Sequence, residues 1–449
     1  MGMANREKAR ADASQKKSKE TARASRSGYL SAKESRAISK ANRKITDELE
    51  KKWKRKNVPE SEFLTTMRDP NNAVEFDDLH TYFFTDSGTV RSVDGVSFEV
   101  PQGQVVGVVG ESGCGKSVTS LSLMQLLQRP QGQIVSGEIR LNMGDKAYEI
   151  SKVPQEKMQT IRGNVVSMIF QEPMTSLNPV FRIGDQVDEV IALHDGEGKS
   201  KEEIKQQTIR ALEMVGIANS EGVYRMYPHE LSGGMRQRVM IAMSLACNPR
   251  VIIADEPTTA LDVTIQAQIL DLLRSLKDRI NSSIMLITHD LGVIAEMADY
   301  VVVMYAGRVV EQGTAEDIFY HPAHPYTMGL MASKPVVGKH VEELYSIPGK
   351  VPNPVNMPDY CYFRDRCEMC VEECSGAYPH VISLSDTHKV SCWRFLEKHR
   401  AHAEDPEKMP AAVREMMDAM RRLHEDNAAK SESGKGSGSA EGEVREDGR

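Results

Sequence analysis

The sequence predicts an α/β protein whose core is a mostly parallel sheet covered by helices. Between residues 73 and 335, short apolar runs alternate with longer amphipathic stretches, which is the pattern of such a sheet. Five runs are almost continuously apolar, as expected of parallel strands buried on both faces. Open α/β sheets bind ligands beyond the carboxyl ends of their strands, so the residues that follow the runs indicate function. The runs are Val105–Val109, Val165–Phe170, Val251–Ala254, Ile284–Thr288 and Val301–Tyr305.

A glycine-rich segment follows the first run. Residues 110–117, GESGCGKS, precede an amphipathic stretch that is expected to be helical, and this context is typical of a phosphate-binding loop. Successive backbone N–H groups and the start of the helix would face the phosphate oxygens. Lys116 is expected to contact the β- and γ-phosphates, and Ser117 to offer a hydroxyl to Mg²⁺. The predicted nucleotide-binding residues here are Gly110, Ser112, Gly113, Cys114, Gly115, Lys116, Ser117 and Val118.

Cys114 lies inside this loop, just before the expected helix. Backbone N–H dipoles at a helix start favour a thiolate, so Cys114 is expected to react with thiol reagents. The open alternative is a thiol that fits the loop but is too shielded to react.

Acidic residues and a histidine follow two other runs. Val251–Ala254 leads into Asp255 and Glu256, and Ile284–Thr288 leads into His289. Asp255 is expected to hold the Mg²⁺ shell, and Glu256 to polarise the water that attacks the γ-phosphate. His289 is expected to hydrogen-bond the γ-phosphate during that attack. Solvated acids at an ordinary strand end and a structural histidine are the alternatives.

The two ends of the chain differ in composition from the middle. Residues 1–56 carry 18 Lys and Arg against 7 Asp and Glu, so we expect residues 1–72 to be a basic arm, disordered or transiently helical. The arm is either attracted to anionic lipid or RNA or is a solvated tail. Residues 401–449 are expected to be a flexible acidic tail. No run approaches the roughly 18 apolar residues of a membrane span, which predicts a cytoplasmic protein.

A further segment of the middle region has a sequence pattern that is highly specific for one protein family. Residues 231–238, LSGGMRQR, resemble the signature motif of the ABC ATPase family. The resemblance implies an ABC-type P-loop ATPase over residues 73–335, with a parallel-sheet core, an N-terminal antiparallel β subdomain and a helical signature subdomain. ATP and Mg²⁺ are its implied ligands. The other motifs follow the family order: the phosphate loop, Gln171, the signature, Asp255 with Glu256, the dimer-contact loop at residues 260–262, and His289.

The resemblance also implies roles for residues outside the strand ends. Gln171 would act in catalysis and in the Mg²⁺ site. Phe83 would stack on adenine, although a core strand residue is the alternative at this position. Ser232, Gly233 and Gly234 would bind ATP held by a partner subunit, so hydrolysis would need two cassettes that enclose the nucleotide.

Two segments resemble the dipeptide and oligopeptide importer branch of the family: residues 171–179, QEPMTSLNP, and residues 324–327, HPYT. Met235 in the signature motif is typical of the first (D-type) of the two paired ATPases in this branch. The resemblance therefore implies a heterodimer. The branch implies two membrane permeases, an extracytoplasmic substrate-binding protein, a place on the cytoplasmic face of the membrane, and no nucleic acid. The alternative is a soluble ABC ATPase in nucleic-acid or ribosome function, but the single signature and the lack of a sustained heptad repeat weigh against it.

A cysteine cluster lies in the region 336–400, which resembles the C-terminal extension of the same branch. The resemblance implies that Cys361, Cys367, Cys374 and Cys392 hold an iron–sulfur (4Fe-4S) cluster. The spacing of Cys367 and Cys370 independently suggests zinc, and unmetallated thiols are the third possibility. Tyr360 stands where the family pattern has glycine.

Overall fold

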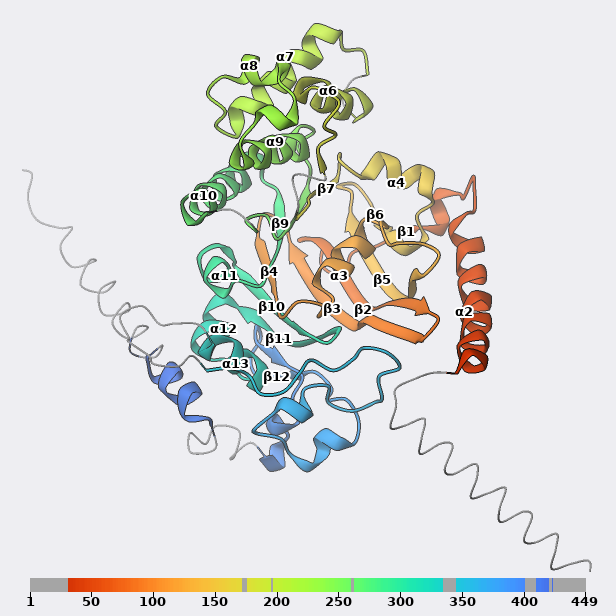
Figure 1. Ribbon diagram of the computed structural model, residues 1–449, viewed down its shortest axis with the longest axis vertical. Coiled ribbons are helices and arrows are strands. Elements are labelled where there is room, and N and C mark those ends of the chain that lie inside the picture. Colours follow the sequence, from red (N-terminus) through yellow and green to blue (C-terminus); the bar gives the residue numbers. More distant parts are fainter. Residues whose placement is uncertain are drawn as a thin grey trace, which may run out of the picture.

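The computed structural model contains two sheets, a group of helices beyond one of them, and a C-terminal region along the edge of the larger sheet (Figure 1). The larger sheet has a parallel core and the smaller one is antiparallel, so the predicted fold class is confirmed. The structure describes residues 31–171, 176–194, 197–259, 262–333, 345–399, 409–419 and 422. Residues 1–30 of the predicted arm and most of the predicted acidic tail lie outside this part of the chain.

All five apolar runs of the sequence are neighbouring strands of the larger sheet. The strand order is β12-β13-β11-β10-β4-β9-β8-β7, and the pairs from β10 to β7 are parallel. The ends of β4, β8 and β9 therefore lie at one edge of the sheet. The strands are β4 (Val105–Val109), β7 (Val166–Ile169), β8 (Val251–Asp255), β9 (Ser283–Thr288), β10 (Tyr300–Tyr305), β11 (Arg308–Thr314), β12 (Ile382–Ser383) and β13 (Lys389–Val390).

Helices and the second sheet bury both faces of β4. Val106 and Val108 belong to a core shared with the antiparallel sheet and with α3, whereas Val105 and Val109 belong to a core shared with α10 and α11. This alternation is the two-residue period of a strand between two layers. The helices of the main body are α3 (Lys116–Leu123), α4 (Gln155–Ile161), α10 (Val263–Ile280), α11 (Leu291–Met297), α12 (Ala315–Tyr320) and α13 (Pro325–Ala332).

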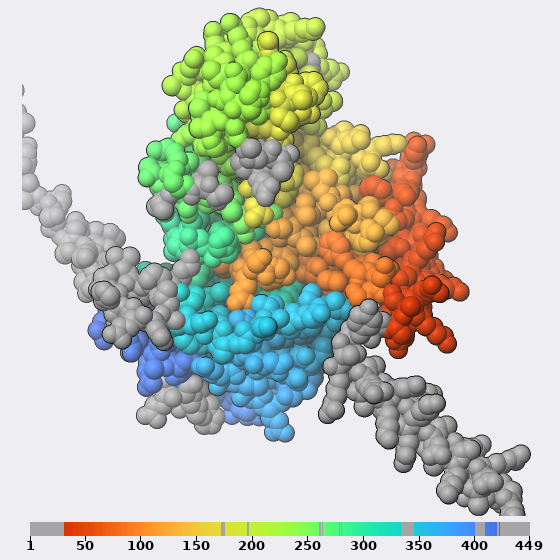
Figure 2. Space-filling view, in the orientation of Figure 1, coloured from red at the N-terminus to blue at the C-terminus, as the bar shows by residue number. Residues whose placement is uncertain are grey.

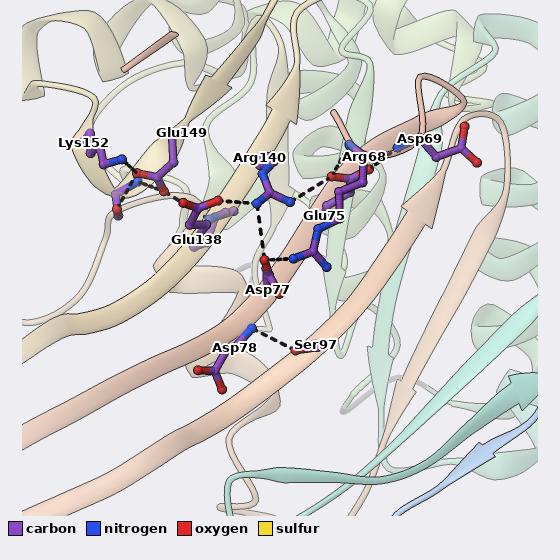
Figure 3. A network of polar contacts seen from close by, with 12 residues as sticks. Arg68, Asp69, Glu75, Asp77, Asp78, Ser97, Glu138, Arg140, Glu149 and Lys152 are labelled. Carbon is purple, nitrogen blue, oxygen red and sulfur yellow. Dashed lines mark hydrogen bonds and ion pairs between the residues drawn. The ribbon is translucent and has the colours of Figure 1, made fainter. Parts of the chain in front are cut away.

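The antiparallel sheet has the strand order β1-β6-β5-β2-β3. Arg140 bonds to Glu75 and Asp77 across one strand pair, and Glu75 also accepts the backbone N–H groups of Arg68 and Asp69 at 2.9 Å each (Figure 3). This network fixes the chain that enters the sheet against its central strands. The strands are β1 (Leu64–Thr65), β2 (Asn72–Thr85), β3 (Gly88–Pro101), β5 (Gly132–Asn142) and β6 (Ala147–Glu149).

Four helices form a separate group at the top of Figure 1. Their shared core includes Leu212, Val223 and Ile241, all at most 2% exposed. Ser200 caps one helix in a capping box with Glu203, as its sequence pattern favours. The helices are α6 (Ile183–His194), α7 (Lys201–Met214), α8 (Ser220–Arg225) and α9 (Gly233–Leu245).

The basic arm differs from its prediction. Residues Ala32–Trp53 form a helix, α2, that lies against the antiparallel sheet (Figure 1, red). Polar contacts hold α2: Asn42 donates to the Thr85 carbonyl at 2.8 Å, and Trp53 lies 4.1 Å from the Arg129 guanidinium. Residues 32–53 are therefore helical in the structure, where the composition predicted a disordered or transiently helical arm.

The C-terminal extension, residues 345–399 of the described chain, does not stand apart from the ATPase core (Figure 2, light blue). Its strand β13 pairs with β11, and Asn356 donates from its backbone to the Thr89 carbonyl at 2.9 Å. Within the described residues, no helix is both long and apolar enough to cross a membrane.

Candidate nucleotide-binding and catalytic site

The predicted phosphate loop connects β4 to α3. Gly115 has φ +103°, and a Cβ atom there would overlap the Ser92 carbonyl oxygen. A Cβ atom at Gly110 would likewise overlap the Met304 carbonyl oxygen. Only glycine therefore allows the loop to curl this tightly against β3 and β10.

Two polar side chains of α3 are held at the loop. Lys116 is 5% exposed, and its Nζ donates to the carbonyls of Gly110 at 2.7 Å and Glu111 at 3.1 Å. Ser117 donates from Oγ to Oδ1 of Asp255 at 3.0 Å. The structure thus brings the loop of β4 and the acidic end of β8 together, as predicted from the parallel order.

Three side chains converge on the Glu256 carboxylate. Gln171 donates from Nε2 to Oε2 at 2.8 Å, and Thr259 donates from Oγ1 to the same oxygen at 2.9 Å. His289 Nδ1 lies 3.3 Å from Oε1. Glu256 has φ +47°, an uncommon conformation for a residue with a side chain, and its backbone N–H bonds to the Ile287 carbonyl. Gln171, Glu256 and His289 come from the ends of three different strands.

The charged and polar groups around Asp255 are suited to bind a cation. Asp255 is 6% exposed, and burial together with the nearby charge of Glu256 raises its pKa, while the bond from Ser117 and the charge of Lys116 lower it. Two adjacent carboxylates and a hydroxyl are oxygen ligands of the kind that Mg²⁺ prefers. The residues present therefore fit a Mg²⁺ ion beside the phosphate loop.

The structure favours the shielded alternative for Cys114 over a reactive thiol. The side chain is 1% exposed, and burial raises the pKa of its thiol. The curled loop encloses the sulfur, and this desolvation outweighs the effect of Lys116. Cys114 is part of the packing under the loop.

The other predicted nucleotide-binding residues, Phe83, Ser232, Gly233 and Gly234, belong to elements other than the phosphate loop. Phe83 is half-buried in β2, opposite Val90 of β3 and Gly132 of β5. Ser232 is the N-cap of α9 and accepts from the Met235 N–H at 3.3 Å. Gly233 and Gly234 are the first residues of α9, which lies in the helical group, apart from α3 (Figure 1). The signature residues are therefore not joined to the phosphate loop of the same chain.

Two predicted segments are only partly described. Residues 172–175 of the importer-like segment and residues 260 and 261 of the dimer-contact loop lie outside the described residues. Asp262, the last residue of that loop, caps α10 by accepting the Ile265 N–H at 2.9 Å.

The iron–sulfur prediction is wrong. Among the described residues, which include all five clustered cysteines, no group of three or more His, Cys, Asp or Glu side chains is placed to hold a metal ion. The Cys361 and Cys374 thiols interact in the main core, and their hydrogen bond raises the pKa of Cys361 and lowers that of Cys374. Cys392 belongs to a different core with Ala323, and Cys370 is exposed. The thiols lie near enough to influence one another's pKa, as Cys370, Cys374 and Cys392 do for Cys367, but they do not form a metal-holding group.

Three residues around the loop were not predicted from the sequence: Glu111, Tyr326 and Arg366. Glu111, a variable position of the loop pattern, donates its N–H to the Tyr326 hydroxyl at 2.8 Å. Its carboxylate accepts two bonds from Arg366, at 2.7 and 3.0 Å. Tyr326 was noted only as part of the HPYT segment, and no local signal pairs Glu111 with Arg366, 255 residues away.

Several large apolar side chains between residues 170 and 193 are exposed. Phe170 precedes Gln171 and is 40% exposed, and Val180 and Phe181 are 70% and 53% exposed. Leu193, near the end of α6, is 72% exposed. Large apolar side chains that remain exposed are candidates for contact with another protein.

This arrangement defines a P-loop ATPase with a cassette architecture: a strand–loop–helix phosphate site, an acidic strand end, and a signature helix in a separate helical group. Residues 93–259 match the model of the ABC transporter family, and residues 310–374 match that of the oligopeptide/dipeptide transporter C-terminal region. The chain belongs to the ABC transporter family, in the branch of the oligopeptide and dipeptide transport ATP-binding proteins. It is an ATP-hydrolysing subunit.

Curated relatives align over most of their length. The chain is 49% identical to the oligopeptide transport ATP-binding protein AppD of Bacillus subtilis over 325 residues, which cover 72% of this chain and 97% of the relative. It is 46% identical to the dipeptide transport ATP-binding protein DppD of the same organism, over 72% of this chain and 94% of the relative. The oligopeptide transport ATP-binding protein OppD of Salmonella typhimurium is 46% identical over 75% of this chain and 98% of the relative.

Proposed function

We propose that the chain powers peptide import as one of two ATPases bound to a pair of membrane permeases. The functions of the relatives, oligopeptide and dipeptide transport, support this cargo class. The observation that carries the catalytic part is the convergence of Gln171, Thr259 and His289 on Glu256, next to Asp255 and the phosphate loop.

The phosphate loop is the ATP-binding element of this proposal. Its backbone N–H groups and the start of α3 bind the phosphate oxygens, and Lys116 turns from the loop carbonyls to the β- and γ-phosphates. Ser112, Gly113 and Val118 complete the loop. Phe83 stacks on the adenine from the antiparallel sheet.

Hydrolysis is assigned to the residues at the strand ends. Glu256 orients the attacking water and accepts its proton, Gln171 holds the Glu256 carboxylate toward the γ-phosphate, and His289 donates to the oxygen that gains charge. Ser117, Asp255 and Gln171 would hold Mg²⁺. That ion neutralises negative charge on the phosphate oxygens when it is bound.

The second half of the nucleotide site comes from a partner ATPase. The N-terminus of α9, with Ser232, Gly233 and Gly234, is an exposed anion-binding end that lies away from its own loop. We therefore assign it to ATP held by the partner. Met235 favours a heterodimer in which this chain is the D-type subunit.

Permease contact is assigned to Phe170, which precedes Gln171, and to the exposed apolar residues that follow in the chain. Phe170, Val180, Phe181 and Leu193 would be covered by a membrane subunit, which couples its motion to the site through Gln171. This places the chain at the cytoplasmic face of the membrane, with an extracytoplasmic binding protein that delivers the peptide. A role on nucleic acid or the ribosome is disfavoured by the transport functions of the relatives.

Replacement of Glu256 by Gln tests the assignment. The amide keeps the bonds from Gln171 and Thr259 but cannot accept the proton of the water, so phosphate release by the assembled transporter should fall about 100-fold or more. ATP binding should persist. Glu221→Gln, which changes an exposed carboxylate in α8, is the matched control and should hydrolyse as the unmodified protein does. Near-normal phosphate release by Glu256→Gln would exclude Glu256 as the base.

A further inference from the structure

A buried arginine of the C-terminal extension binds the phosphate loop. The Arg366 side chain is 6% exposed, and its two terminal nitrogens donate to the two carboxylate oxygens of Glu111 at 2.7 and 3.0 Å. Its Nε donates to the Pro348 carbonyl at 2.9 Å, and Nη1 also lies 3.4 Å from the Tyr305 hydroxyl. A bidentate, charge-assisted pair with a fixed guanidinium is among the most directional contacts available to a side chain.

Glu111 is held through each of its polar groups. Besides the two bonds from Arg366, its N–H donates to the Tyr326 hydroxyl at 2.8 Å, and its carbonyl accepts from Lys116 at 3.1 Å. Tyr326 is completely buried in α13. The first side chain of the phosphate loop is therefore fixed from outside the loop by two elements of the C-terminal half of the chain.

We propose that Arg366 is a positioning residue for ATP binding: through Glu111, the C-terminal extension holds the phosphate loop in its binding conformation and so sets the affinity for ATP. The inference rests on the proposed role of the loop in binding phosphate. A loop that is ordered before binding loses less conformational entropy when the nucleotide arrives, so its affinity is higher.

Other contacts attach the extension independently of Arg366. Tyr362 donates to Oδ2 of the buried Asp94 at 3.0 Å, Asn356 bonds to β3, and β13 completes the main sheet. Loss of the Arg366 side chain should therefore leave the extension in place and free only Glu111. A role confined to folding would instead leave the ATP affinity of the folded protein unchanged.

The test measures binding of a non-hydrolysable ATP analogue with Mg²⁺ to the full chain by titration calorimetry. Arg366→Met and Glu111→Ala should each weaken binding about tenfold, the effect of losing one charge-assisted contact. The double variant should bind about as well as either single variant, because both changes remove the same contact. Arg364→Met is the matched control, since Arg364 lies in the same short helix but bonds to Asp365 and stacks on Tyr360.

Each outcome has a distinct meaning. Unchanged affinity in Arg366→Met, or a double variant weakened about 100-fold as the product of independent effects, would overturn the proposal. A parallel turnover assay should show a raised KM for ATP with kcat within about twofold, because the carboxylate of Glu256 is untouched. If either single variant lowers the melting temperature, binding is compared at a temperature at which the variant is folded, and unchanged affinity there would indicate a role in folding alone. Failure of the unmodified chain to bind the analogue would instead refute the proposed function of the loop.

Discussion

Glu50 should control whether helix α2 stays on the ATPase core. Its side chain is 11% exposed, and its Oε1 accepts from Arg129 Nη1 at 2.9 Å and from Gln133 Nε2 at 2.8 Å. Arg129 in turn lies beneath Trp53, whose indole N–H donates to Gln125 at 3.0 Å. The replacement Glu50→Ala removes the only carboxylate that the structure places against Arg129 within the described residues.

The expected cost follows from these contacts. A hydrogen bond to a charged group contributes about 1.5–3 kcal/mol net, and a buried cation left without its partner costs about 3–5 kcal/mol. The Arg129 side chain is 15% exposed and can recover part of its hydration. We therefore expect Glu50→Ala to weaken the docking of α2 by about 3 kcal/mol. The ion pair of Glu50 with Lys54 adds little, because Lys54 is 67% exposed. A loss of about 3 kcal/mol shifts the docking equilibrium of α2 about 100-fold toward release.

Hydrogen exchange of the full chain measures this equilibrium. In Glu50→Ala, amides of residues 32–53 should exchange about 100-fold faster, and the emission of Trp53 should move toward that of a hydrated indole. The matched control is Arg43→Ala, which removes a pair with Asp47 at 3.9 Å whose side chains are 83% and 61% exposed. It should change exchange less than threefold. Equal protection of residues 32–53 in Glu50→Ala and the unmodified protein would refute this account of the docking.

Two further predictions concern titrating and nucleophilic groups. Cys114 should resist alkylation in the folded protein and react after unfolding, as read by mass spectrometry, and labelling at the unfolded rate in native protein would contradict its burial. The bond to Asp94 raises the pKa of His80, so its contribution to stability is complete below the unfolded pKa of about 6.5 and is lost as pH rises through the folded pKa. The melting temperature of the unmodified protein relative to His80→Gln should therefore fall from pH 6 to pH 8.5, and a pH-independent difference would contradict it.

The strands and the strand-end chemistry could be predicted because their signals are local. Val105–Val109 is a strand with the predicted bounds, since burial on both faces makes the whole run apolar. Asp255 is the last residue of β8, and His289 directly follows β9. Because β8 and β9 are parallel neighbours, both residues lie at the same edge of the sheet. Because the carboxyl ends of parallel strands lie at one edge of a sheet, residues that follow different strands in the sequence can be predicted to be neighbours.

Helix α2 and the cysteines could not be predicted because they depend on distant partners. The arm looked too polar to fold, but Glu50 pairs with Arg129, 79 residues away, and this contact is absent from any window of the sequence. The iron–sulfur expectation rested on a family resemblance, and no metal-holding group forms among the described cysteines.

The phosphate loop shows where a motif stops being informative. The pattern fixes the glycines, Lys116 and Ser117, whose geometry is set within the loop, and it leaves Glu111 free. In the folded chain Glu111 is bonded to Tyr326 and Arg366, both in the C-terminal region that distinguishes this branch of the family. A position left open by the shared motif is therefore where a branch-specific region can act on shared chemistry. If the loop binds ATP phosphate as proposed, Glu111 offers a point at which the affinity for ATP can change without a change in the residues assigned to hydrolysis.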